Sequence, residues 1–153
     1  KPTASDWSHS RLKTYEYLLA IKNLNIKNCW PTLLVGSNKY GENTKEFEKL
    51  LEYCLKFFVR ARTICGAHPN ELGMLSANIS EKIRNSSFKV DDVKKMLKSN
   101  PLYPNPAQFL NNFCTKSVGT RTASYILSEI NLKYYHMHHL IVALLSLDVY
   151  HLV

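Results

Sequence analysis

Four histidines near the C-terminal end form the densest group of metal-ligating side chains in the sequence: His136, His138, His139 and His151. Two histidines one residue apart on a strand can share a metal ion, and a third can complete the site. A zinc site normally uses paired ligand spacing with cysteines or carboxylates, and here the nearby acid is Asp148. We therefore interpret the cluster as incidental and predict no metal or other cofactor in this chain.

Basic side chains are the second group with a chemical use. The 153 residues include 20 lysines and arginines against 12 aspartates and glutamates, which gives a formal net charge of +8. This excess favours anionic partners, of which nucleic acid is the commonest. The candidates for contact with DNA are Arg60, Arg62, Lys94, Lys95, Lys98 and Arg121. The structural alternative for the arginines is that one of them ends its helix and pairs with Glu71 or Glu81. For the lysines, the alternative is a solvated helix face.

The sequence gives little support to a nucleophilic active site or to a glycine-rich phosphate-binding loop. The four cysteines, Cys29, Cys54, Cys65 and Cys114, form no C-x-x-C pair, which predicts buried free thiols in a reducing compartment. Cys65 and His68 lie close in sequence, but no neighbouring residue orients a base toward the thiol. The five glycines are scattered and form neither a Walker A loop nor a G-x-G-x-x-G motif.

The elements that must position these residues are helical almost throughout. Over residues 45–64, apolar residues recur at steps of three and four, with Thr44 placed to cap the helix and Gly66 to end it. Shorter helical patterns cover residues 6–23, 30–35, 72–83, 90–97, 106–114 and 120–130. Residues 36–41 end the helix predicted over 30–35. We predict an all-α fold, an irregular multi-helix bundle. Residues 146–153 alternate in polarity and allow one short C-terminal strand.

The apolar positions of the shorter patterns predict which side chains face the core. They are Leu12, Tyr15 and Leu19 in the first helix, Leu72, Leu75, Ile79 and Ile83 after residue 70, Phe109, Leu110, Phe113 and Cys114 after residue 105, and Ala123, Ile126, Leu127 and Ile130 after residue 120. Aromatic residues on such stripes serve packing rather than base stacking.

The two ends of the sequence bear on location and domain organisation. No apolar stretch opens the chain, and the longest apolar run, over residues 140–145, is shorter than the roughly 20 residues that a membrane span needs. We expect a cytoplasmic protein with no membrane partner. The sequence starts at Lys1 and stops just after an apolar run, so we expect a fragment. Its predicted parts are a helical domain over residues 1–135 and an apolar tail over residues 136–153.

Residues 47–83 carry an ordered set of features. An apolar helix is followed by Arg60 and Arg62, then by the run 64–66 (Ile-Cys-Gly), and then by Asn70 before the next helix. Further along stand Tyr103-Pro104, Gln108-Phe109, Arg121 and the run 125–127 (Tyr-Ile-Leu). This order resembles the helical middle region of Gmr-type restriction endonucleases over about two thirds of the chain. The sequence departs from that family where Ala61 separates the arginines, which are commonly adjacent.

The resemblance implies a position between two other domains. In that family a ParB-like domain precedes the helical region and an HNH nuclease domain follows it, so residues 147–152 look like the start of a truncated nuclease domain. The missing domains would be partners of this chain, and the nucleotide and divalent metal would belong to the parent protein, which cleaves modified foreign DNA. This chain alone should not cleave DNA, because the HNH reaction needs metal ligands and a general base that the sequence lacks.

We therefore expect a non-catalytic helical domain of a restriction or defence-type DNA endonuclease. It would position the nucleotide-sensing and nuclease domains and touch DNA phosphates. Two alternatives remain open. One is a stand-alone basic helical module whose affinity for nucleic acid falls steeply with salt. The other is a protein-interaction scaffold with no role in nucleic-acid binding.

Overall fold

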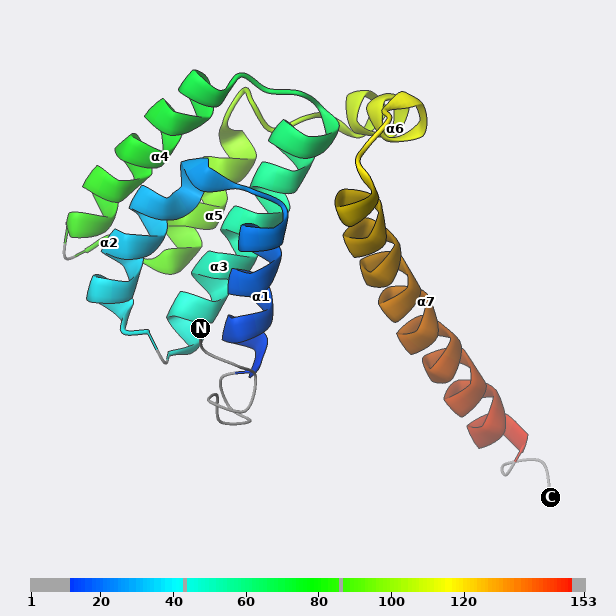
Figure 1. Cartoon of the computed structure of the whole chain (residues 1–153). Coiled ribbons are helices and arrows are strands. Elements are labelled where there is room, and N and C mark those ends of the chain that lie inside the picture. Colours follow the sequence, from blue (N-terminus) through cyan, green and yellow to red (C-terminus); the bar gives the residue numbers. More distant parts are fainter. Residues whose placement is uncertain (1–11, 43, 86, 150–153) are drawn as a thin grey trace. The chain divides into compact units, whose positions relative to one another are not determined.

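The computed structural model describes residues 12–42, 44–85 and 87–149 (Figure 1). The chain divides into two compact units, Lys1–Ser117 and Val118–Val153. The first unit contains α1 (Leu12–Asn23), the 3-10 turn η3 (Lys27–Cys29), α2 (Trp30–Tyr40), α3 (Lys45–Phe58), the π-helix η4 (Val59–Ile64), α4 (Pro69–Arg84), α5 (Val90–Ser99) and α6 (Pro106–Thr115), and the second contains α7 (Thr120–Val149). The predicted all-α fold is confirmed, since the described residues contain no strand.

Helix α3 is the centre of the first unit. It packs against α1, α2 and α5, which surround it in Figure 1. The predicted apolar stripe is confirmed at Phe47, Leu50, Leu51, Cys54, Leu55 and Phe58. Phe57 is buried as well, whereas Val59, also predicted on the stripe, is half-buried. Thr44 caps the helix as expected, because its side-chain oxygen accepts a hydrogen bond from the Phe47 amide at 3.2 Å.

Helix α4 covers the outer side of α2. Its predicted inward residues, Leu72, Leu75, Ile79 and Ile83, are all buried. Two buried hydroxyls also meet at this interface, where Thr32 Oγ1 lies 2.8 Å from Ser76 Oγ and donates to the Ser76 carbonyl at 3.0 Å. The pairing matters because a buried hydroxyl without a partner would destabilise the fold.

Two predictions about α1 and α2 are wrong. Leu12 and Leu19 are each 39% exposed, and the buried face of α1 carries Thr14, Ala20 and Ile21 instead. The apolar residues of α1 lie all around the helix, so spacing alone did not select the inner face. The helix predicted over residues 30–35 continues to Tyr40, with Gly36 inside it. The missing side chain of Gly36 lets α2 approach the Leu50 side chain closely.

Helix α6 also departs from the expectation, since none of its residues is buried. Leu110 is 62% exposed, and Phe113 and Cys114 are exposed as well. Phe109 is half-buried and stacks on Phe113, with ring centroids 5.7 Å apart. The reason is that α6 contacts the rest of the first unit mainly through the short helix η4, so its apolar side does not reach the core.

The second unit contains a longer helix than expected. Helix α7 runs without interruption to Val149, so the predicted strand is wrong over residues 146–149, and residues 150–153 lie outside the described ranges. A strand needs a partner strand for its backbone hydrogen bonds, whereas a helix forms them internally. Leu127 and Ile130 are 64% and 49% exposed rather than inward-facing. The division at residue 135 stays a prediction.

None of the helices in the described ranges combines the length and the apolar character needed to cross a membrane.

Candidate functional site

The π-helix η4 carries both arginines of the sequence motif. It continues α3 for six residues, Val59–Ile64, and closes at a glycine in the left-handed conformation, Gly66, with φ of +72°. Wide-turn backbone bonds hold it, such as the Cys65 amide donating to the Arg60 carbonyl at 3.0 Å and the Ala67 amide to the Ala61 carbonyl at 2.8 Å. Helices of this kind are rare and occur frequently at functional sites. The prediction that Gly66 ends the helix is confirmed.

Arg62 lines a surface pocket of about 430 Å³. The walls are the turn after α1, the end of η4, the start of α4 and the residue after α6, and the lining residues are Leu24, Asn25, Ile26, Lys27, Asn28, Arg62, Thr63, Pro69 and Lys116. One guanidinium nitrogen of Arg62 donates to the Ala67 carbonyl at 3.0 Å, which fixes the side chain at the end of the helix.

The pocket is positively charged. Lys27, Arg62 and Lys116 come from three separate parts of the first unit, and no described lining residue is an acid. In the described part of the chain, the ion pairs join Lys56 to Glu52 and Lys95 to Asp92, so none of these three cations is neutralised in that way. The Lys116 ammonium lies 3.4 Å from where a Cβ at Gly66 would stand. Cations that line one pocket with no acid among its described lining residues favour an anion there.

The wall formed by the turn after α1 is anchored to α4. The Asn28 side-chain amide donates to the Pro69 carbonyl at 2.8 Å, across 41 positions of sequence. Asn25 adopts a left-handed conformation with φ of +56°, which turns the chain into η3. Pro69 is the first residue of α4, so the positive end of that helix dipole also borders the pocket.

Arg60, by contrast, packs against aromatic rings. Its guanidinium carbon lies 4.1 Å from the ring centroid of Phe109 and 5.3 Å from that of Tyr103. Tyr103 in turn stacks on Phe57, with centroids 6.2 Å apart. The Arg60 Nε atom is buried and has no hydrogen-bond partner among the described residues. Arg60 therefore fastens α6 and its preceding loop to η4, through cation–π contacts of about 0.5–2 kcal/mol each.

The other predicted DNA-contact residues lie away from the pocket lining. Lys94, Lys95 and Lys98 are exposed on α5, where Lys94 sits over the Tyr53 ring at 5.1 Å and Lys95 pairs with Asp92 at 3.1 Å. Arg121 belongs to α7 in the second unit. The pairing of an arginine with Glu71 or Glu81 is not among the ion pairs of the described residues.

Sequence reasoning missed Lys27 and Lys116. Each is a single lysine at a boundary between helices, one after the break that follows α1 and the other directly after α6. No periodicity links them to Arg62, because only the folded chain brings residues 27, 62 and 116 together. The sole signal in the sequence is the polar character of residues 23–28.

The histidines of the cluster that fall in the described ranges lie on a helix, and the interpretation of the cluster as incidental stays a prediction. Residues 136, 138 and 139 lie on the α7 helix rather than on a strand, and residue 151 lies outside the described ranges. Among the side chains that the structure describes, which do not include those of residues 136–153, no three metal-ligating groups come together.

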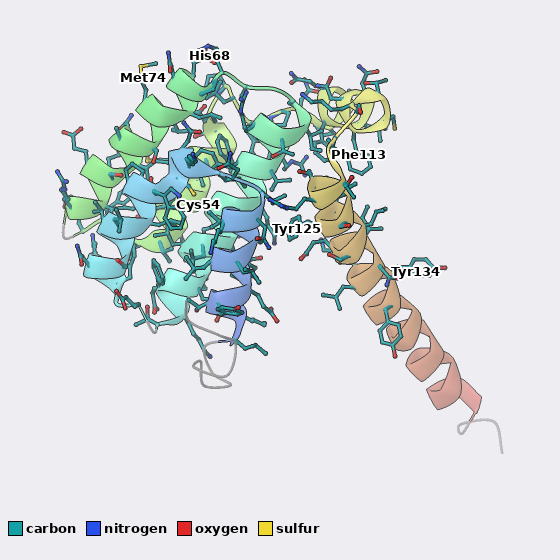
Figure 2. All side chains as sticks on the ribbon, viewed as in Figure 1. Cys54, His68, Met74, Phe113, Tyr125 and Tyr134 are labelled. Carbon is teal, nitrogen blue, oxygen red and sulfur yellow. The ribbon has the colours of Figure 1, made fainter. Side chains whose placement is uncertain are left out.

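Two of the four cysteines belong to the core of the first unit. Cys29 and Cys54 are buried as expected, whereas Cys65 is half-buried and Cys114 is exposed, which corrects the expectation of a buried thiol at those two positions. Burial raises the pKa of the Cys29 thiol to about 12 and raises that of Cys54 as well. His68 caps α4, on whose outer end it lies in Figure 2, since its Nδ1 accepts from the Asn70 amide at 3.3 Å.

The arrangement at the pocket can hold an anion by charge and by directed N–H donors. It offers three cations and two asparagine side chains around one volume. Comparison with known proteins adds no assignment: no family model, no curated protein and no solved structure gives a significant match to this chain.

Proposed function

We propose that the first unit is a non-catalytic module that contacts the phosphate backbone of nucleic acid. The observation that carries this proposal is the convergence of Lys27, Arg62 and Lys116 on one pocket whose described lining contains no acid. Lysine and arginine are the side chains that neutralise phosphates and release their counterions. The net charge of +8 supports the same class of partner.

The chemistry of the pocket suits positioning rather than base recognition. Arg62 has five N–H donors, and its bond to the Ala67 carbonyl occupies one nitrogen while it sets the orientation of the fork. Contacts between such side chains and phosphates fix the register of a protein on nucleic acid but carry no sequence information. The module would therefore hold a strand in place for chemistry performed elsewhere.

The family resemblance supplies the wider context of the proposal. On the features of residues 47–83 we infer a parent protein of the Gmr-type restriction endonuclease class, in which other domains bind the nucleotide and the metal. The two arginines of the motif then serve different purposes. Arg62 faces the phosphate pocket, and Arg60 secures the neighbouring helix through Tyr103 and Phe109.

The test is the salt dependence of binding to duplex DNA. Each phosphate contact contributes about −0.9 to the slope of log Kobs against log salt concentration. Replacing Lys27, Arg62 and Lys116 together by alanine should therefore make the slope shallower by about 3. The matched control removes the same charge from α5, with Lys94, Lys95 and Lys98 replaced by alanine, and should change the slope less.

Two results would contradict the proposal. One is an unchanged slope in the pocket variant, and the other is an equal change in both triple variants. If the native chain shows no salt-dependent binding at all, the scaffold alternative gains support instead. Incubation of the purified chain with DNA, divalent metal and nucleotide should leave the DNA intact, and cleavage would remove the non-catalytic part of the proposal.

A further inference from the structure

Helix α6 supplies Lys116 to the basic pocket but has little packing of its own. Lys116 is the residue directly after the helix, and its amide donates to the Asn112 carbonyl at 2.9 Å, so its backbone moves with α6. No residue of α6 is buried, and the helix contacts the rest of the first unit mainly through η4. The position of the Lys116 ammonium therefore depends on what holds α6 against η4.

One face of α6 makes that contact. Phe109 and Asn112 are half-buried, and every other residue of the helix is exposed. Phe109, Asn112 and Lys116 are spaced by three and four positions, so they lie on the same side of the helix. Phe109 meets the Arg60 guanidinium near the start of this face, and the Lys116 ammonium lies close to Gly66 at its end. The face therefore follows η4 from its second residue to the glycine that closes it.

The contact at Arg60 is made through aromatic rings. The guanidinium carbon lies 4.1 Å from the ring centroid of Phe109, whereas the Tyr103 ring, in the loop before α6, is 5.3 Å away. The Arg60 Nε atom is buried without a hydrogen-bond partner among the described residues. Arg60 is not one of the residues that line the pocket, so it can act on a bound phosphate only at a distance or through α6.

We propose that Arg60 is a positioning residue of the phosphate pocket, which sets Lys116 beside Arg62 by holding the Phe109 face of α6 on η4. This inference rests on the proposed function of the pocket. The Ala67 carbonyl already fixes Arg62 at the end of η4, so docking of α6 brings a second cation to a fixed first one. Two such cations repel each other when no anion is bound. Helix α6 therefore needs a contact that does not depend on the phosphate, and Arg60 provides it.

A neutral substitution separates positioning from charge. In the full chain, Phe109→Ala removes the ring nearest to Arg60 and leaves the net charge unchanged. The slope of log Kobs against log salt concentration for duplex DNA should become shallower by about 1, because the phosphate contact of Lys116 is lost. Lys116→Ala should give the same change, and the double variant should go no further. Phe109→Tyr keeps a ring and should retain the native slope. Leu110→Ala is the matched control, since Leu110 is 62% exposed and lies outside the docked face.

Spin-label distances test the docking of α6 without DNA. In a Cys65→Ser background, one label sits on exposed Cys114 of α6 and the other on a cysteine introduced by Asn78→Cys at an exposed position of α4, while the two buried cysteines stay unlabelled. The native sequence and Leu110→Ala should give one narrow distance distribution, and Phe109→Ala a broad one. Circular dichroism should show the first unit folded in each variant, because neither substituted side chain of α6 is buried.

Three results would overturn the proposal. The first is a native salt slope in Phe109→Ala while the triple variant of Lys27, Arg62 and Lys116 shifts it. The second is a narrow distance distribution in Phe109→Ala, which would mean that another contact holds α6. The third is an equal effect of Leu110→Ala. An unchanged slope in the triple variant is a different failure, because it refutes the phosphate site itself and this proposal with it.

Discussion

Replacement of Gly36 by alanine should destabilise the first unit, although alanine forms helices better than glycine. In an exposed helix interior the change to alanine is worth up to about 1 kcal/mol of stabilisation. At Gly36, however, an added Cβ would overlap Leu50 Cδ2 and lie 3.6 Å from Leu50 Cγ. Leu50 is fully buried, so its methyl group cannot swing into solvent. Overpacking of this kind costs about 1–3 kcal/mol, and we expect a net loss of about 1 kcal/mol.

Gly73 in α4 provides the matched control. A Cβ there would meet the Asn28 side-chain nitrogen at 3.8 Å, which is an ordinary van der Waals distance. Gly73→Ala should therefore stabilise the unit by a value approaching 1 kcal/mol. Urea denaturation followed by circular dichroism gives the free energy of unfolding of both variants, with the slope m checked for constancy. The two glycine substitutions should move that free energy in opposite directions.

A second substitution at the contact tests the cause. Leu50→Ala alone should cost about 2–5 kcal/mol because it empties part of the core. In that background, Gly36→Ala should become stabilising, because the overlapping methyl group is gone and the new Cβ fills some of the space. Should Gly36→Ala stabilise the native chain as much as Gly73→Ala does, the close approach of α2 to α3 would be refuted.

Two further outcomes follow from local contacts. Thr44→Ala removes the hydroxyl that caps α3 and should lower the free energy of unfolding by about 1 kcal/mol, measured by urea denaturation, whereas Thr44→Ser should retain most of it. Thiol-specific labelling with mass analysis should modify exposed Cys114 first and leave Cys29 unreacted in the native state. Because burial raises its pKa to about 12, the Cys29 side chain stays a thiol below that pH. Raising the pH from 7 to 9 should therefore leave Cys29 labelled more slowly than Cys114. Equal labelling rates for the two cysteines would contradict the burial of Cys29.

The arginine pair illustrates how one motif divides into two functions. In a regular α-helix Arg60 and Arg62 would lie about 200° apart, and the sequence already predicted that one of them needs a partner. The sequence offered two alternatives, contact with DNA or an arginine that ends its helix and pairs with Glu71 or Glu81. Arg62 donates to the carbonyl of Ala67, just past the end of η4, while Arg60 packs against the faces of two aromatic rings.

The sequence by itself determined the helical class and the central helix. Six buried side chains follow the repeat of α3 closely, and Thr44 and Gly66 mark where that helical segment begins and ends. These features are local, because a strongly one-sided helix has a single face that can be buried and its caps bond to backbone within a few residues. The inner face of α4 was predictable for the same reason.

Tertiary structure alone decided the inner face of α1, the continuation of α2 through Gly36 and the composition of the basic pocket. Helix α1 has apolar residues on every side, so only its contact with α3 selects Ile21 over Leu19. Lys27, Arg62 and Lys116 are separated by 35 and 54 positions, and no local rule relates them. They meet because the hydrogen bond from Asn28 to the Pro69 carbonyl and the packing of α6 on η4 bring distant parts of the chain together.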